Sequence, residues 1–155
     1  MKKQILPVCF LLLLITACGG ETPAPASVVA PAAEPEPAGL PRTTSVAGAT
    51  VFFISPADGD TVSNPVRVVF GIEGMEVVPA GENAPHSGHH HLLIDTGLPD
   101  LGLPIPKDAQ HVHFGDGSTE TEITLEPGQH TLQMLLGDHL HIPHDPPLVT
   151  DPITR

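Results

Sequence analysis

Short runs of alternating apolar and polar residues dominate the chain beyond residue 48. The clearest run covers residues 66–72, where every second residue, beginning with Val66, is apolar. Residues 122–125 and 131–136 repeat the pattern. A period of two is typical of strands with one buried face. No stretch of about 12 residues keeps a 3.6-residue period, so the pattern predicts no long helix.

Turn sequences separate these runs, at residues 56–59 (Pro-Ala-Asp-Gly), 63–65 (Ser-Asn-Pro), 126–128 (Glu-Pro-Gly) and 145–147 (Asp-Pro-Pro). The strands expected between them span residues 51–54, 66–72, 89–95, 109–114, 120–125, 130–136 and 148–154. About seven short strands in about 100 residues predict an all-β fold, an immunoglobulin-like antiparallel β-sandwich.

The N-terminus has the pattern of an export signal. Residues 5–15 are apolar and follow Lys2 and Lys3, but a bilayer-spanning helix needs about 20 apolar residues. The run ends in Ile-Thr-Ala-Cys at 15–18, which resembles the lipobox of bacterial lipoproteins. The resemblance implies a signal peptide at 1–17 and two acyl chains on Cys18, which suffice for stable anchoring in a lipid bilayer. The alternative is an ordinary cleaved signal with a chance cysteine.

Residues 18–48 are rich in Pro and Ala and predict a disordered tether. The remaining residues, 49–155, are long enough for one domain with one core, and we expect them to form it. In this likeness to lipoproteins, Gly19 rather than Asp favours the outer membrane, facing the periplasm. The net charge is −12, and cleavage would also remove Lys2 and Lys3. Such a surface disfavours nucleic acid and anionic lipid as partners and favours cations; a protein partner is not indicated.

All ten histidines lie between His86 and His144, and the only cysteines are Cys9 and Cys18. The expected mature domain has no thiol, so a metal there must bind to nitrogen and oxygen, with Met75 and Met134 as the only sulfur candidates. Met134 is expected in the core because it lies on the apolar face of its strand.

Residues i and i+2 of a strand project from the same face. The histidines that this spacing predicts as metal ligands form three pairs: His89 with His91, His111 with His113, and, if that segment is extended, His139 with His141. Asp95, Asp138, Asp145 and His144 are candidates to support these imidazoles or to add a ligand. Imidazole ligands suit copper and zinc ions.

A structural role is the alternative for each histidine, because imidazoles also hydrogen-bond to backbone and carboxylates in irregular loops. His90 and His130 are the strongest candidates for that role. No nucleophile motif, phosphate loop or dinucleotide fingerprint is present. Glu82 and Glu120 are candidate bases only by proximity in sequence. No catalytic residue is therefore predicted, and an enzyme is the less favoured class.

Two stretches carry a family resemblance: GHHHLLIDT at 88–96, and HVHFGDGSTETEITLEPGQHTLQMLLGDHLHIPHDPP at 111–147. Together they closely resemble the bacterial envelope family DUF4399, a domain of unknown function. The resemblance implies a small exported domain, often on a lipoprotein, and brings no established activity. Its members are expected to have a further strand with an apolar end, whereas this chain ends in DPITR.

A shorter stretch, HVHFGDGST at 111–119, resembles the copper-ligand strand of Cu/Zn superoxide dismutases. That likeness would make His111 and His113 copper ligands, but the disulfide, zinc loop and active-site arginine of those enzymes have no counterpart here. Three functions therefore stay open: an envelope lipoprotein that binds copper or zinc for buffering, carriage or sensing; a metal-free module that binds a protein or glycan; and a copper-dependent redox enzyme.

Overall fold

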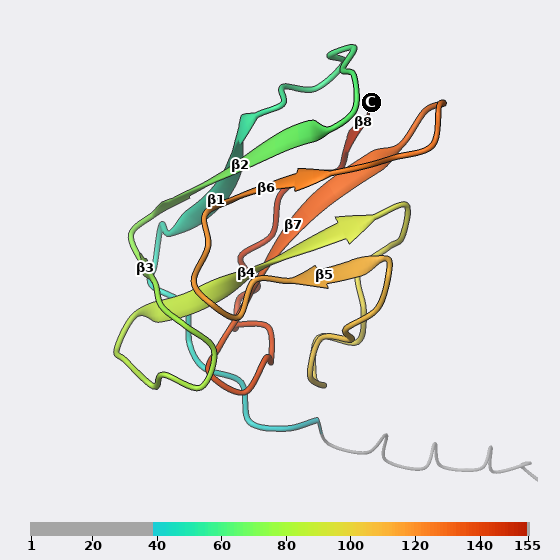
Figure 1. The fold of residues 1–155 in the computed structure, drawn as a ribbon. Helices are drawn as coiled ribbons and strands as arrows, with labels where there is room; N and C mark the ends of the chain where they lie inside the picture. Colours follow the sequence, from blue (N-terminus) through green and yellow to red (C-terminus); the bar gives the residue numbers. More distant parts are fainter. Residues whose placement is uncertain (1–38, 155) are drawn as a thin grey trace, which may run out of the picture. The chain divides into compact units, whose positions relative to one another are not determined.

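The computed structural model describes residues 39–154. The expected signal peptide, Cys18 and most of the expected tether lie outside the described residues. The described part consists of eight strands and has no α-helix (Figure 1). Accordingly, none of residues 39–154 belongs to a helix long and apolar enough to span a bilayer.

The first sheet has three antiparallel strands in the order β1-β2-β6. These are β1 (Thr50–Ser55), β2 (Val66–Glu73) and β6 (Glu120–Ile123). In β2 the predicted alternation is realised, because Val66, Val68 and Phe70 are buried while Arg67 is exposed. One face of this sheet therefore lies on the core.

The second sheet is built around β4 (Ser87–Ile94) and β7 (Thr131–Gly137), which pair antiparallel. The short strand β8 (Ile153–Thr154) pairs with β7. Two further strands share the other edge of β4: β3 (Glu76–Val77) runs parallel to its first residues, and β5 (His111–His113) runs antiparallel to residues 91–93. The two sheets form an open sandwich-like arrangement, which confirms the predicted all-β fold.

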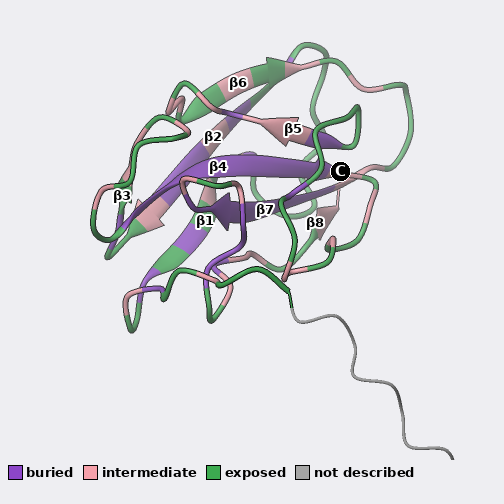
Figure 2. Ribbon diagram, turned by 90° about the horizontal axis from the view of Figure 1, so that it is seen from below, coloured by how far each residue is buried: buried purple, intermediate pink, exposed green. Residues whose placement is uncertain are grey.

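The main core contains the apolar face of β2 and one face of the β4–β7 pair, with Leu92, Leu132, Met134 and Leu136 fully buried. The opposite face of β4 and β7 is also buried, although alternation predicted only one buried face for residues 131–136 (Figure 2). Leu93, Leu135 and Ile105 form a second, smaller cluster on that face. Ile105 comes from the segment between β4 and β5. This segment therefore covers part of the outer face, which the sequence pattern predicted to be exposed and polar.

The predicted strands are present with different ends. The expected strand at 109–114 is reduced to three residues, and that at 148–154 to Ile153–Thr154 with an isolated bridge between Leu135 and Val149. The ordered domain also begins before residue 49. Thr44 bridges Asp145, and Arg42 donates to the carbonyl of Pro143, so part of the segment assigned to the tether lies against the domain.

Candidate metal centre

Four imidazoles meet on the outer face of the second sheet. His89 and His91 project from the same face of β4, as their i,i+2 spacing predicts. His113 joins them because it pairs with His91 across the β4–β5 ladder. His141 approaches from the turn after β7. We call these four residues the imidazole cluster.

The ring centroids of the cluster lie close together. The separations from His89 are 4.8 Å to His91, 5.0 Å to His113 and 4.9 Å to His141. The three other separations are 5.1, 6.1 and 4.7 Å. The Nε2 atoms of His113 and His141 are 3.1 Å apart, so one imidazole N–H donates to the other ring. Nitrogens of His89, His113 and His141 all lie within 4.8 Å of one another.

A tightly closed turn positions His141. The Asp138 carboxylate accepts hydrogen bonds from the backbone N–H groups of Leu140 and Ile142 and from the Thr43 hydroxyl. His141 has φ 67°, a conformation that non-glycine residues adopt infrequently and that is often found at functional sites. Its carbonyl accepts a hydrogen bond from Ile105. The imidazole is therefore held over the sheet by a rigid backbone.

The two imidazoles that β4 contributes to the cluster are fully buried, with 0% and 1% of His89 and His91 exposed. Neither nitrogen of either ring has a hydrogen-bond partner among the described residues. A buried polar atom without a partner costs about 1–3 kcal/mol, and such atoms in native structures call for an explanation, such as a bound ion. A nitrogen of His89 lies within 4.8 Å of nitrogens of His113 and His141, whereas the Cε1–Nδ1 edge of the His91 ring faces Gly137.

Burial favours the neutral form of three rings of the cluster, those of His89, His91 and His113. It lowers the pKa of His91 from 6.5 to about 2, and the three neighbouring imidazoles add to this effect. Burial also lowers the pKa of His89 to about 4, with further contributions from His141 and His113. The pKa of His113 is lowered by burial, by His141 and by Lys107. At neutral pH these rings therefore carry the free lone pair that a metal ion requires.

The nearby carboxylates offset positive charge without occupying the cluster. Burial alone would raise the pKa of Asp138, but hydrogen bonds from Thr43, Ile142 and Leu140 outweigh it, so the pKa lies below its usual value. The resulting negative charge of Asp138 acts to raise the pKa of His89, and the charge of Asp116 acts to raise that of His113, but burial outweighs both. A dication in the cluster would thus lie near two carboxylates.

Two glycines, which the sequence did not single out, make room for the rings. A Cβ at Gly137 would lie 2.8 Å from Cε1 of His91, and one at Gly115 would lie 2.3 Å from Cε1 of His113. Either substitution would displace a ring of the cluster. The only signal in the sequence was their position, because Gly115 directly follows His113-Phe114 and Gly137 lies at the end of a strand.

His111 and His139, also predicted as ligands, lie outside the cluster. His111 shares the face of His113 but pairs with Leu93, two residues further along the ladder, and its Nδ1 lies 2.9 Å from the Asp108 carboxylate. His139 is half-buried in the turn before His141. The i,i+2 rule holds only for extended backbone, whereas residues 139–141 form a turn.

The candidate supporting residues have other roles. Asp138 shapes the turn of His141 through the backbone and not through a ring N–H. His144 is fully buried, its Nε2 lies 3.2 Å from the carbonyl of Ser87, and it packs against Gly88 and Leu136. Asp145 pairs with Arg42. Met75 and Met134 are both buried in the main core.

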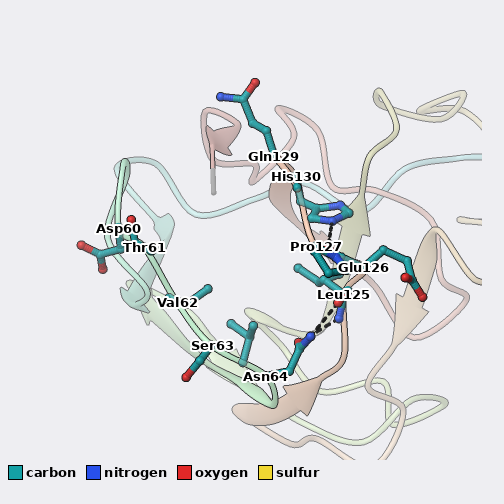
Figure 3. A pocket seen from close by; sticks show the side chains of 12 residues that line it. Asp60, Thr61, Val62, Ser63, Asn64, Leu125, Glu126, Pro127, Gln129 and His130 are labelled. Atoms are coloured by element: carbon teal, nitrogen blue, oxygen red, sulfur yellow. Dashed lines mark hydrogen bonds between the residues drawn. The ribbon is translucent and has the colours of Figure 1, made fainter.

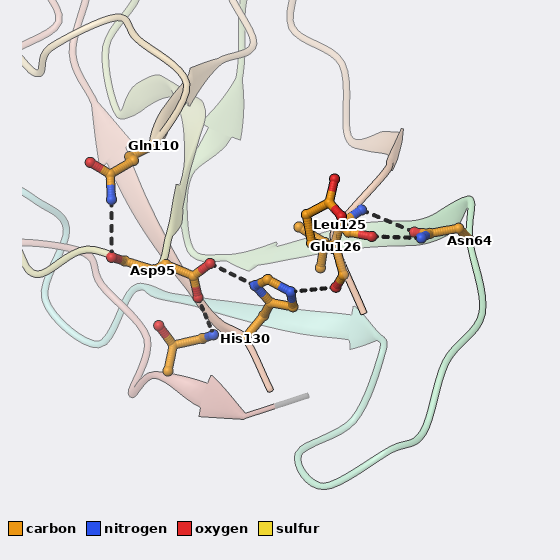
Figure 4. A network of polar contacts seen from close by, with 7 residues as sticks. Asn64, Asp95, Gln110, Leu125, Glu126 and His130 are labelled. Atoms are coloured by element: carbon orange, nitrogen blue, oxygen red, sulfur yellow. Dashed lines mark hydrogen bonds and ion pairs between the residues drawn. The ribbon is translucent and has the colours of Figure 1, made fainter. Parts of the chain in front are cut away.

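Asp95 and His130 form a separate network at the far end of β7 (Figure 4). The Nδ1 of His130 lies 2.6 Å from the Asp95 carboxylate, and its Nε2 lies 2.7 Å from the carbonyl oxygen of Glu126. Asp95 also accepts a hydrogen bond from the backbone of Thr131. These contacts agree with the structural role predicted for His130, and they engage Asp95 away from the imidazole cluster.

A groove of about 490 Å³ lies between residues 60–64 and 125–130 (Figure 3). The amide of Asn64 both donates to and accepts from the backbone of Leu125 along its floor. Two polar side chains at its rim serve their own turns, since Asp60 accepts from the backbone of Ala57 and His130 is held by Asp95 and by the carbonyl of Glu126. The groove therefore carries no set of converging ligand groups.

Residues 68–154 match the family described as "Domain of unknown function (DUF4399)". This match covers more than half of the chain and all four members of the imidazole cluster. The chain belongs to the DUF4399 family. No curated protein and no solved structure matches it. Membership confirms the resemblance seen in residues 88–96 and 111–147, and it assigns the DUF4399 domain no activity.

Proposed function

We propose that the DUF4399 domain binds a divalent transition metal ion, copper or zinc, through the imidazole cluster. The observation that carries this proposal is the convergence of four histidine rings, with centroids 4.7–6.1 Å apart. Two of these rings are fully buried with unpaired nitrogens. Imidazole nitrogens are preferred ligands of both ions.

A purely structural role for the cluster explains less. Histidines that stabilise loops do so by hydrogen bonds, as His130 does with Asp95 and Glu126. Within the imidazole cluster the only close polar contact between two rings is the one between His113 and His141. Metal coordination would use the remaining nitrogens and would remove much of the cost of burying them.

The ligand set favours storage or carriage of the ion over catalysis. Structural metal sites in proteins use four protein ligands, whereas catalytic sites keep one coordination position open for water or substrate. Nitrogens of His89, His113 and His141 lie within 4.8 Å of one another, and His91 would supply the fourth ligand of a four-coordinate shell. His111 is engaged by Asp108 instead of lying beside His113 as a copper ligand, so the arrangement gives no support to a redox site like that of superoxide dismutase. Buffering, carriage or sensing of the ion in the cell envelope is the function we infer.

We further propose that the domain is exported and held at a membrane by lipid on Cys18, with the outer membrane facing the periplasm as the location. The support is the sequence pattern of residues 1–18 for the anchor and Gly19 for the outer membrane. An anchored buffer would keep its bound ion close to the membrane. Radiolabelled palmitate incorporated into the wild-type chain and lost from Cys18→Ser would support the anchor, and equal labelling of both would overturn it.

The metal-free alternative, a module that binds a protein or glycan, would rest on the groove of Figure 3. Its rim residues Asp60 and His130 already bond to their own loops, so the imidazole cluster supports metal binding better than the groove supports a ligand. Selective loss of metal from a cluster variant would separate the two functions.

The test is elemental analysis of the full chain, purified without an affinity tag of histidines, for the wild type and two matched variants. His113→Gln removes a ligand, whereas His111→Gln changes the other histidine on the same face of β5. We expect one equivalent of metal in the wild type and in His111→Gln, and a loss of most of it in His113→Gln. Equal metal content in the two variants, or none in the wild type after incubation with copper or zinc, would overturn the proposal.

A further inference from the structure

The imidazole cluster has the shape of a tetrahedron and not of a flat square. Three rings, His89, His91 and His113, project from the sheet and form a nearly equilateral triangle with sides of 4.8, 5.0 and 5.1 Å. His141 belongs to a turn outside the sheet, and its ring lies 4.9, 6.1 and 4.7 Å from the other three.

A square arrangement makes a different demand on these distances. Four ligands in a plane have two diagonals, each longer than the sides by a factor of about 1.4. If His91 and His141, at 6.1 Å, were one diagonal, then His89 and His113 would be the other. Their separation is 5.0 Å, no longer than a side. With metal–nitrogen distances of about 2.0–2.1 Å, rings around a tetrahedral ion should have centroids about 5 Å apart.

The surroundings prevent the cluster from flattening. His91 cannot move toward the strand end without meeting Gly137, which already lies close to its ring. His141 is fixed by the turn that Asp138 closes and by the hydrogen bond from Ile105 to its carbonyl. His113 lies directly against Gly115. A bound ion would therefore have to adapt to the rings.

We propose that this geometry makes the site selective for an ion that accepts tetrahedral coordination, Zn²⁺, over Cu²⁺, which prefers a tetragonal plane. The inference rests on the proposed metal-binding function. Without a geometric constraint, a nitrogen site binds Cu²⁺ more tightly than Zn²⁺, and proteins reverse or reduce that order through geometry and ligand type. Here all ligands are imidazole nitrogens, and no thiolate or thioether of the described residues lies in the cluster, so geometry is the means that remains.

His141 supplies the decisive contrast because it alone lies outside the basal triangle. The variant His141→Asn keeps a residue type that tolerates positive φ, and circular dichroism would confirm that the strands persist. With His141 absent, two of the basal imidazoles and two waters can form a plane around the ion, and the third imidazole then lies on its axis. Loss of a direct ligand should lower the Zn²⁺ affinity by about a hundredfold, at the upper end of what even outer-shell changes cost. The Cu²⁺ affinity should fall about tenfold less, because Cu²⁺ gains its preferred plane.

The experiment measures Zn²⁺ and Cu²⁺ affinities by competition with a chelator, for the full-length wild type, His141→Asn and His111→Gln. Electron paramagnetic resonance of the Cu²⁺ forms adds the geometry. We expect the small parallel hyperfine splitting of flattened-tetrahedral copper in the wild type and in His111→Gln, and the large splitting of tetragonal copper in His141→Asn.

Equal losses for both ions in His141→Asn, or a tetragonal wild-type spectrum, would overturn the selectivity while leaving metal binding intact. If neither ion bound to the wild type, the proposed function itself would fail.

Discussion

His90 and His91 are consecutive residues of β4, and both are buried with ring nitrogens that have no hydrogen-bond partner among the described residues. They face opposite sides of the sheet. His90 lies in the main core, with its ring 5.1 Å from Phe70, whereas His91 lies among three other imidazoles. An unpaired buried histidine is therefore not by itself a sign of a metal site in this domain.

The difference between the two faces is convergence. On the core side an imidazole replaces an apolar side chain, and burial lowers its pKa to about 4. On the outer side β5 and the turn after β7 bring further rings to the same point. A buried ring without hydrogen-bond partners therefore has a functional explanation on the outer face only. Mutations of His90 and His91 should distinguish the two faces.

The largest expected effect is metal-dependent stability. With Zn²⁺ at about a thousandfold excess over its Kd, the free energy of unfolding should rise by about 4 kcal/mol. His91→Leu should abolish this increase because it removes a ligand, whereas His90→Leu should retain it. The measurement is chemical denaturation of each protein with Zn²⁺ and with a chelator. A similar loss in both variants would contradict the distinction between the faces.

The next effect concerns acid. His90 has a pKa of about 4 in the folded chain and 6.5 as its model value, so the unfolded chain takes up the proton first. Its contribution to stability is complete above pH 6.5 and is lost as the pH falls toward 4, by roughly 3 kcal/mol.

With a chelator present, denaturation of the wild type and of His90→Leu across this range should show a shallower decline for the variant. The buried rings of the imidazole cluster contribute the same loss of stability in both proteins, so their contribution cancels in the difference between the two curves. Parallel curves would show that His90 is not kept neutral by the core.

A smaller effect should follow from crowding the outer face without removing a ligand. Gly137→Ala places a Cβ 2.8 Å from Cε1 of His91, and overpacking of this kind costs about 1–3 kcal/mol. We expect a Zn²⁺ affinity about tenfold lower, by the same displacement of a ring that outer-shell changes produce. Gly97→Ala is the control, because nothing lies within 4 Å of its added Cβ. Calorimetric titration that gives equal affinities for both would argue against a tightly fitted ring.

The sequence predicted these features unequally, for physical reasons. Period-two spacing placed His89, His91 and His113 on the same faces as the structure does, because strand geometry is local. His141 was predicted on the assumption of an extended segment, and the turn closed by Asp138 brought it to the cluster by another route. His111 has the same local pattern as His113. Its pairing with Asp108 depends on the path of the segment between β4 and β5, which no local rule gives.

The burial of the outer face was equally beyond a local pattern. Alternation in residues 131–136 predicts one exposed face, yet Leu135 is fully buried. The reason is the coverage by Ile105 and Val149, which come from distant parts of the chain. His89 and His91 lie on the same outer face and are buried as well. The candidate site therefore depends on contacts that only the folded chain has.

The smallest expected effect involves His130, which contrasts with the cluster because it has partners for both ring nitrogens. The hydrogen bond to Asp95, and secondarily that to the Glu126 carbonyl, raise the pKa of His130 above 6.5. This interaction stabilises the fold below pH 6.5 and is lost as the pH rises through the folded pKa.

Since the pair is partly exposed, His130→Gln should cost no more than about 1 kcal/mol at pH about 5.5, and less at pH about 8.5. Its metal content should equal that of the wild type. Denaturation at the two pH values, with elemental analysis of the same samples, tests both statements. A loss of metal in His130→Gln would mean that the two ends of β7 are coupled, whereas a loss of stability alone would confirm that one histidine holds a loop while four others form the candidate ion site.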